Sequence, residues 1–332
     1  NSREWVVAAV AAMTCGAAIV PLNTRLKGRE AGDILRRTHA RMMFTVRGFL
    51  GIDYPELLSA EDLPDLAETV LLDTDFGAFL ASGQGADDGG VDAALSRLTA
   101  DHLSDILLTS GTTGVPKCIV HGAGGTLLQH LKEHLLHTDV KPGDKLFYFT
   151  TCGWMMWNWL ASGLASGATL VLYDGSPFAS DGQLLLDAID AEAITIFGTS
   201  AKFISSLEKV GVKPRETHHL SSLNTILSTG SPLSHESFEF VYRDFKTDVL
   251  LASIAGGTDI ISCFVGGCPT RPVYTGQIQC RALGMDVEFW GDHGSVLSEG
   301  KGELVCKISF PSMPIGFYND SDGRKYHAAY FA

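Results

Sequence analysis

A run of hydroxyl side chains, glycines and one lysine separates two apolar stretches of the chain. Residues 109–117 read TSGTTGVPK, made of Thr109, Ser110, Gly111, Thr112, Thr113, Gly114, Val115, Pro116 and Lys117. Glycines let backbone amides approach an anion, hydroxyls add donors, and a lysine adds a point charge, so this combination can wrap a polyphosphate. The Walker pattern is not met, because Pro116 replaces its second glycine and Cys118 its magnesium-binding hydroxyl. The run predicts a phosphate loop of another kind.

The residues around this run resemble a known enzyme superfamily. Residues 106–117 match, position for position, the AMP-binding signature of adenylate-forming enzymes, which include acyl-coenzyme A synthetases, peptide synthetase adenylation domains and luciferases. The acetoacetyl-coenzyme A synthetase branch resembles this chain, in the same order, at residues 150–177, 228–242 and 252–260. That likeness runs from about residue 107 to 332, whereas residues 1–70 are more similar to medium-chain, long-chain or steroid-side-chain acyl-coenzyme A ligases.

The resemblance implies a site for ATP and Mg²⁺. The nucleotide would be bound by Thr109, Ser110, Gly111, Thr112, Thr113, Gly114, Lys117, Gly230, Ser231, Pro232 and Thr258. The catalytic residues would be Lys117, Thr258 and Asp259. Among these, Thr258 corresponds to the family threonine on the α-phosphate and Asp259 to the magnesium-binding glutamate. Aspartate is an ordinary oxygen ligand for magnesium; a strand-end carboxylate without a metal is the alternative.

The resemblance also implies a pocket for the acid. Its walls would be Cys152, Trp154, Ala255, Gly256 and Gly257. Ala255 stands where many members stack an aromatic ring on adenine, so part of the base contact must come from elsewhere. Gly256 stands where acetate-specific relatives carry a tryptophan, which implies a longer pocket that admits a four-carbon keto acid. Cys152 and Trp154 would wall this pocket or be ordinary packing residues.

The implied reaction is an ATP-dependent acid–thiol ligation with coenzyme A as a substrate. A carboxylate would attack the α-phosphorus of MgATP, pyrophosphate would leave, and the thiol of coenzyme A would attack the acyl adenylate. Positioning and charge neutralisation would supply the catalysis, without a protein nucleophile. Acetoacetate is the expected acid. The alternatives are a medium-chain or steroid-derived acid, a carrier protein as acceptor, or a nucleotide-binding fragment or pseudoenzyme without turnover.

The family pattern continues past both ends of the sequence. In relatives, residues like those at 326–332 (YHAAYFA) are followed by a Gly-Asp pair that binds the ribose and by a C-terminal domain with a catalytic lysine. The first residues, NSREWVVAA, resemble a segment in the middle of the family's N-terminal domain. We therefore expect a truncated N-terminal domain that lacks the lysine domain. Turnover should be weak or absent if these residues are the whole polypeptide, because losing one preorganised donor costs about 10²- to 10³-fold in rate.

Alternating helix and strand patterns must position the site. Helical patterns begin at Trp5 and cover residues 27–40. Apolar runs of strand type occur at 17–23, 105–110, 145–151, 168–175, 193–200, 224–230 and 248–257. Such runs, separated by helices, predict a parallel sheet with ligands beyond the carboxyl ends of its strands. The Gly- and Asp-rich residues 82–91 predict a loop or linker, and the strands after about 270 predict a small antiparallel unit.

These elements indicate an α/β fold: stacked, mostly parallel sheets and helices of an adenylate-forming N-terminal domain, plus a small antiparallel β unit. We expect an incomplete first subdomain at 1–105 and an incomplete β-barrel-like subdomain at 271–332. Between them, residues 106–270 would form the subdomain with the phosphate loop and the nucleotide site.

Charge and composition limit the partners. The net charge of -13 argues against nucleic acid or an anionic membrane as the main partner. Seven cysteines without a CxxC pair indicate reduced thiols and a cytoplasmic protein. The apolar stretch after Trp5 is broken by Gly16 and Pro21, which favours a buried helix over a membrane span. The expected partners are a small carboxylic acid, ATP and coenzyme A; oligomeric state is not indicated.

Four histidines are the remaining candidates. His130, His134 and His137 share a helical stripe, a spacing that can bind a metal. At about 100° per residue, however, the stripe lies about 125° from the leucines at 128, 131 and 135. We therefore expect a solvated polar flank. His121, just after the phosphate loop, is expected to be a packed or capping residue rather than a base.

Overall fold

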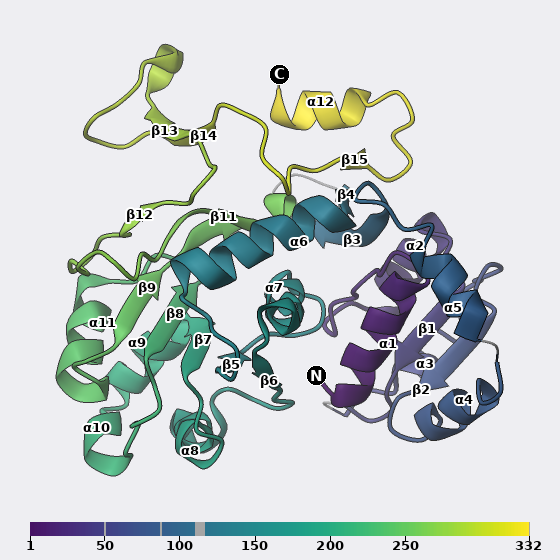
Figure 1. Cartoon of the computed structure of the whole chain (residues 1–332), viewed down its shortest axis with the longest axis horizontal. Coiled ribbons are helices and arrows are strands. Elements are labelled where there is room, and N and C mark those ends of the chain that lie inside the picture. Colours follow the sequence, from purple (N-terminus) through teal and green to yellow (C-terminus); the bar gives the residue numbers. More distant parts are fainter. Residues whose placement is uncertain (50, 87, 110–116, 332) are drawn as a thin grey trace. The chain divides into compact units, whose positions relative to one another are not determined.

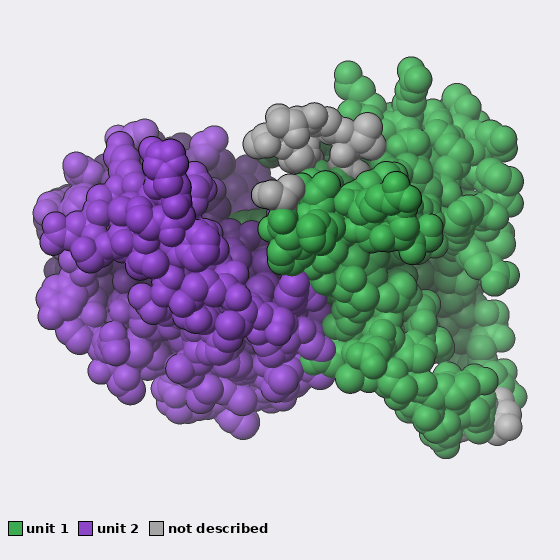
Figure 2. Space-filling model, turned by 90° about the horizontal axis from the view of Figure 1, so that it is seen from above, with its two compact units in different colours: residues 1–124, 151–154, 314–332 green, residues 125–150, 155–313 purple. Residues whose placement is uncertain are grey.

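The structure is a computed structural model that describes residues 1–49, 51–86, 88–109 and 117–331. The chain divides into two compact units, shown in different colours in Figure 2. Unit 1 comprises Asn1–Gly124, Thr151–Trp154 and Pro314–Ala332, and unit 2 comprises Gly125–Thr150 and Met155–Met313. The division expected from the sequence, at 105/106 and 270/271, is a different partition and stays a prediction.

Unit 1 combines short helices with two small sheets (Figure 1). Its helices are α1 (Arg3–Thr14), α2 (Gly28–Arg37), α3 (Tyr54–Leu57), α4 (Phe76–Ser82), α5 (Asp88–Leu95) and α12 (Arg324–Tyr330). One sheet pairs β1 (Met42–Thr45) in parallel with β2 (Glu68–Leu71). The other is antiparallel in the order β15-β4-β3, formed by β15 (Gly316–Phe317), β4 (Lys117–Gly122) and β3 (Leu103–Thr109).

The two helices expected near the start of the chain are present. The Ser2 hydroxyl caps α1 by accepting a hydrogen bond from the Trp5 amide. Ala8 and Ala9 are buried, whereas Val7 and Val10 on the same helix are exposed, so α1 is half-buried rather than enclosed. No helix within the described ranges is long and apolar enough to cross a bilayer.

Two expectations for unit 1 are wrong. The run at 105–110 does not join a parallel sheet; as β3 it pairs antiparallel with β4, with Leu107 opposite Ile119. The connection between these strands is too short for a parallel crossover, which needs a dozen or more residues. The predicted loop at 82–91 contains the end of α4 and the start of α5.

Unit 2 is built on a five-stranded parallel sheet, which confirms the expected α/β fold. The strand order is β6-β5-β7-β8-β9. The strands are β5 (Lys145–Tyr148), β6 (Thr169–Val171), β7 (Ile196–Ser200), β8 (Thr225–Thr229) and β9 (Leu250–Ser253). Each falls within a run that the sequence predicted as a strand, because strands buried on both faces are apolar throughout.

Helices and helical turns lead into this sheet and connect its strands. They are α6 (Ala123–Lys132), the π-helix η1 (Glu133–His137), α7 (Met156–Ser162), η2 (Gly163–Ser166), η3 (Ala179–Gly182), α8 (Gln183–Ala191), α9 (Ala201–Lys209), α10 (Pro214–Thr217), α11 (His235–Phe240) and the π-helix η4 (Val241–Phe245).

Small antiparallel sheets complete unit 2. The strands after about 270 are antiparallel as expected, but residues 255–257, expected at the end of a parallel strand, form an antiparallel strand of their own. The first has the order β10-β11-β12, formed by β10 (Ala255–Gly257), β11 (Ser262–Gly266) and β12 (Cys280–Arg281). The second pairs β13 (Val287–Trp290) with β14 (Glu303–Cys306). Two 3₁₀ turns lie among them, η5 (Thr258–Ile260) and η6 (Asp292–Gly294).

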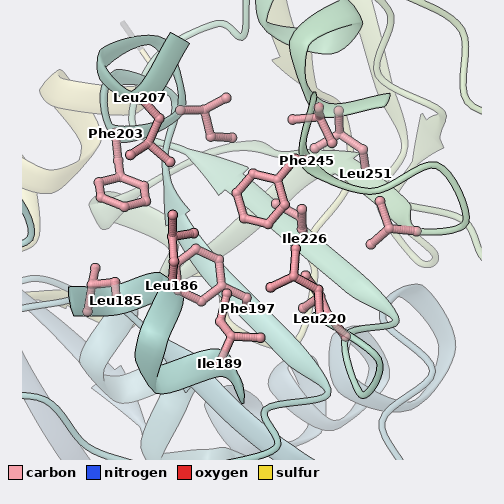
Figure 3. Packing of buried hydrophobic residues seen from close by; sticks show 14 of the residues in the cluster. Leu185, Leu186, Ile189, Phe197, Phe203, Leu207, Leu220, Ile226, Phe245 and Leu251 are labelled. Carbon is pink, nitrogen blue, oxygen red and sulfur yellow. The ribbon is translucent and has the colours of Figure 1, made fainter. Parts of the chain in front are cut away.

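The main core packs side chains of the parallel sheet against those of α8, α9, α11 and η4 (Figure 3). Phe197 in β7 is 1% exposed, and its ring stacks on Phe147 in β5 with centroids 5.1 Å apart. Leu186 in α8 and Phe203 in α9 pack in the same cluster. Each such side chain contributes about 1.5–3 kcal/mol on burial. This core fixes the strands, and therefore the positions of the segments that leave their carboxyl ends.

Candidate functional site

Two of the expected site segments leave neighbouring strands of the parallel sheet. Strands β8 and β9 pair in parallel, so their carboxyl ends lie at one edge. Gly230, Ser231 and Pro232 follow β8 and are exposed, and Gly230 has a φ of 88°, which favours glycine. The hydroxyl of Thr229 donates to the carbonyl of Ile254 at 2.9 Å, which ties the two strand ends together. Open α/β sheets bind ligands at such an edge.

The segment after β9 carries Thr258 and Asp259 on a single 3₁₀ turn. Both residues are half-buried. The carbonyl of Ile260 accepts a hydrogen bond from the Ser312 hydroxyl at 2.7 Å. Ile261, the next residue, has φ 49° and ψ 30°, the left-handed region that β-branched residues avoid. Such a conformation costs about 1–3 kcal/mol and persists only where the surroundings fix it.

Gly256 is required by the approach of a neighbouring strand. A Cβ at this position would lie 2.1 Å from the carbonyl oxygen of Ser262 and 2.5 Å from the Cα of Cys263. The register of β10 against β11 shifts between Ala255 and Gly256, which brings the backbones together. The close approach of the β11 backbone therefore explains why this chain has a glycine at position 256. The roles of Ala255, Gly256 and Gly257 in an acid pocket stay predictions.

Unit 1 holds the described ends of the expected phosphate loop. Thr109 and Lys117 are register partners at the ends of β3 and β4. The hydroxyl oxygen of Thr109 is buried and has no hydrogen-bond partner among the described residues. The Lys117 ammonium lies 5.1 Å from the ring centroid of Tyr330 and 5.8 Å from that of Phe317, a cation–π arrangement.

The middle of this loop lies outside the described residues. The expected ligands there are Ser110, Gly111, Thr112, Thr113 and Gly114. An unpartnered buried hydroxyl such as that of Thr109 costs free energy until it finds a partner. A phosphate oxygen would be a suitable acceptor, so the described ends fit the expected ligand.

Cys152 and Trp154 belong to unit 1 and are half-buried. The Cys152 thiol donates to Oδ1 of Asn1 at 3.3 Å. Between them, Gly153 lies so close to the backbone of Asn23 that a Cβ would stand 2.6 Å from its Cα. These contacts support the alternative in which Cys152 and Trp154 are ordinary packing residues. Their role as walls of an acid pocket stays a prediction.

The expected solvated histidine flank is wrong. His130 and His134 are fully buried and His137 is 7% exposed, whereas Leu128 and Leu135 are 59% and 45% exposed. The reason is that each imidazole has a backbone partner inside unit 2. His130 bonds the carbonyl of Ile261 at 2.6 Å, and His134 and His137 bond those of Trp159 and Gly267. Within the described part of the chain, no cluster of three or more residues could hold a metal.

Burial sets the ionisation of these rings. Removal from water lowers the pKa of His134 to about 3, and it lowers the pKa of His130 and of His137 as well. The three rings are therefore neutral at physiological pH. His121 in β4 is also fully buried, which confirms that it is a packed residue.

Sequence reasoning missed a polar network next to these histidines. Glu133 is 4% exposed, and its carboxylate accepts hydrogen bonds from the Trp159 indole at 3.0 Å and from the Ser262 hydroxyl. Gln129 donates to the same hydroxyl at 2.9 Å. Gln129 and Glu133 lie on the histidine stripe, so the sequence signal was a helix face made only of polar residues that can bond in several directions.

A parallel sheet with small polar segments at the carboxyl ends of β8 and β9 defines an α/β nucleotide- or cofactor-binding architecture. A family model described as AMP-binding enzyme matches residues 1–311, and the chain belongs to this family.

Three relatives illustrate the likeness. The acetoacetyl-coenzyme A synthetase of Rhizobium meliloti (strain 1021) is 63% identical over 235 residues, which cover 71% of this chain and 36% of the relative. That of Mus musculus is 52% identical over 271 residues, which cover 82% of this chain and 39% of the relative. The solved structure of acetoacetyl-CoA synthetase from Streptomyces lividans is similar with a TM-score of 0.86 and 36% identity, over 100% of this chain and 53% of that one. The chain thus spans well under half the length of the first two relatives.

Proposed function

We propose that this chain forms the nucleotide-binding part of an ATP-dependent acid–coenzyme A ligase that acts on acetoacetate. The observation that carries the proposal is the 63% identity to an acetoacetyl-coenzyme A synthetase across 71% of the chain. The matching AMP-binding family model adds to it, because such a family implies ATP as the activating nucleotide.

We propose that Gly230, Ser231 and Pro232 lie along the base and that Thr258 binds the α-phosphate. Their exit from neighbouring strand ends, with Gly230 in a left-handed turn, supports this role. Asp259 would hold Mg²⁺, which when bound would neutralise phosphate charge. The half-buried carboxylate on a short, braced turn fits a ligand that must be held in place.

The phosphates beyond the α-position would be held by residues 109–117. The buried hydroxyl of Thr109 and the cation of Lys117 support this role from the two described ends. The acid carboxylate would then attack the α-phosphorus as the bond to pyrophosphate breaks. In the second half, the thiolate of coenzyme A would attack the acyl carbon and AMP would leave. The protein's part in both steps is positioning and charge stabilisation.

The test is carboxylate-dependent exchange of labelled pyrophosphate into ATP. It is run on this chain and on the full product of the gene that encodes it, with acetoacetate, acetate, a medium-chain acid and a steroid-derived acid. We expect exchange with acetoacetate at least about tenfold above acetate, as one or two pocket contacts can supply. Preference for a medium-chain or steroid-derived acid would replace acetoacetate as the substrate. No exchange by either protein would favour a nucleotide-binding segment without turnover.

The acceptor and the compartment need separate measurements. Thioester formation is compared with coenzyme A and with acyl carrier proteins, and we expect coenzyme A to be used. We also propose a cytoplasmic location, which the seven free thiols support. Cell fractionation with an antibody against the chain tests the location.

A further inference from the structure

A buried polar cluster in unit 2 bonds each of the four residues that follow Asp259. The bonds come from helix α6, from η1 and from the segment before Pro314. In sequence order the bonded groups are the carbonyl of Ile260, the carbonyl of Ile261, the hydroxyl of Ser262 and the amide of Cys263. Side chains distant in sequence therefore bond four successive positions, in addition to the turn's own bond from the Ile261 amide to the Thr258 carbonyl at 3.2 Å.

The first arm of the cluster is a chain of hydrogen bonds that ends on Ile261. A carbonyl can only accept, so Nε2 of His130 carries the hydrogen that is donated to Ile261 at 2.6 Å. In the neutral ring, Nδ1 is then an acceptor and lies 2.9 Å from the Ser162 hydroxyl, which also donates to the Trp159 carbonyl at 2.8 Å. Ser162 in turn lies 3.1 Å from Nε2 of His134, which also reaches the carbonyl of Trp159. The chain orients His130 toward the turn.

The second arm is the carboxylate of Glu133. Oε1 accepts from the Ser262 hydroxyl and from the Cys263 amide at 3.3 Å, and Oε2 accepts from the Trp159 indole at 3.0 Å. The Lys132 ammonium lies 3.5 Å from Oε1 and supplies the countercharge. Breaking such a buried set leaves an uncompensated charge, so the arm is rigid.

The first arm ends at a strained residue, Ile261, which directly precedes the two residues that the second arm bonds. Ile261 is fully buried and holds a left-handed backbone conformation with φ 49°. No β-branched residue adopts this region without help from its surroundings. The strain lies two residues after Asp259, at the point where the chain turns from η5 into β11.

We propose that His130 and Glu133 are positioning residues that hold the Thr258–Asp259 turn in the geometry that binds the nucleotide and its metal. The inference rests on the proposed function, because it gives the turn its ligand. The bracing itself is a property of this chain's contacts, and it can be measured without any ligand.

The test compares two substitutions at one position. The amide of His130→Gln can place a donor near the position of Nε2, whereas His130→Leu removes the bond to Ile261. His137→Leu is the matched control, since this buried ring bonds Gly267 at the far end of β11. Without ligand, amide hydrogen exchange is followed in the segment 258–263. We expect exchange about tenfold faster in His130→Leu, within about threefold of wild type in His130→Gln, and unchanged in His137→Leu.

The second readout is the Mg²⁺ concentration that half-saturates ATP binding or pyrophosphate exchange. We expect an increase of about tenfold in His130→Leu and none in His137→Leu, even where both variants lose thermal stability equally. Equal Mg²⁺ dependence in these two variants, or His130→Gln behaving like His130→Leu, would overturn the proposal.

Two precautions keep the outcomes distinct. If His130→Leu does not fold, Ser262→Ala tests the Glu133 arm instead, because it removes the hydroxyl that donates to Glu133 and accepts from Gln129; unchanged exchange at 258–263 would then overturn the bracing role. If the wild-type chain binds no ATP in a Mg²⁺-dependent way, the proposed function fails, while the ligand-free hydrogen exchange still decides whether His130 holds the turn.

Discussion

Asp259 is the single residue on which the proposed metal site depends. We predict that Asp259→Asn lowers pyrophosphate exchange about 10²- to 10³-fold, because it removes the charge that would hold the cation. Asp259→Glu is the matched control, since the resemblance to adenylate-forming enzymes implies a glutamate at this position, and it should retain most of the rate. Equal loss in both variants, with normal folding, would argue that the position acts through packing and binds no metal.

A substitution at Gly256 can distinguish a role in backbone packing from a role in the acid pocket. We predict that Gly256→Ala destabilises the protein by about 1–3 kcal/mol, because its Cβ would press on the backbone of Ser262 in β11. Urea unfolding monitored by fluorescence measures the change. Unaltered stability together with a shift of acid preference from acetoacetate to acetate would instead support the pocket role.

The helix formed by α6 and η1 carries a pH dependence. The folded-state pKa of His134 is about 3, far below the unfolded value, so the unfolded chain binds the extra proton. The contribution of the neutral His134 ring to the free energy of unfolding is complete above about pH 6.5. It is lost as the pH falls toward 3, by at most about 1.4 kcal/mol per pH unit. The ring lies against the His130 ring and the Trp159 indole, and the neighbouring His130 lowers the pKa of His134 further.

We predict that the loss of stability between pH 7 and pH 5 is smaller in His134→Gln than in wild type. An amide can keep the bond to the Trp159 carbonyl and does not titrate. Urea midpoints at both pH values measure the difference, and the control is His218→Gln, whose ring is 7% exposed and lies 3.0 Å from the exposed carboxylate of Asp187. Parallel pH profiles for wild type and His134→Gln would contradict the assignment.

At the scale of the whole molecule, the two units have cores of unequal size. Unit 2 encloses the large cluster around Phe197, whereas unit 1 has small clusters such as those around Val70 and Leu35. Because burial of apolar surface is the main stabilising term, we predict that unit 1 unfolds at lower urea concentration. Variants that keep only Trp5 or only Trp157 report the two units separately. Coincident transitions would show that the units unfold as one.

The sequence predicted the strands of the parallel sheet because their signal is local. Each is an apolar run bounded by small residues, as in the run 193–200 that became β7. The run that became β3 is equally apolar, but its partner is the antiparallel strand β4. Pairing direction depends on the length of the connection and on what lies opposite, and neither is written in the run itself.

The site divides in the same way. Residue types and spacing indicated the phosphate loop at 109–117, whereas the segments at 230–232 and 258–259 were implied by the resemblance to adenylate-forming enzymes. The burial of the histidine stripe, the strand beside Gly256 and the left-handed Ile261 were decided only by the tertiary structure. Their partners lie up to 146 residues away, as with His137 and the amide of Leu283, and no local pattern records which distant backbone group a buried imidazole will meet.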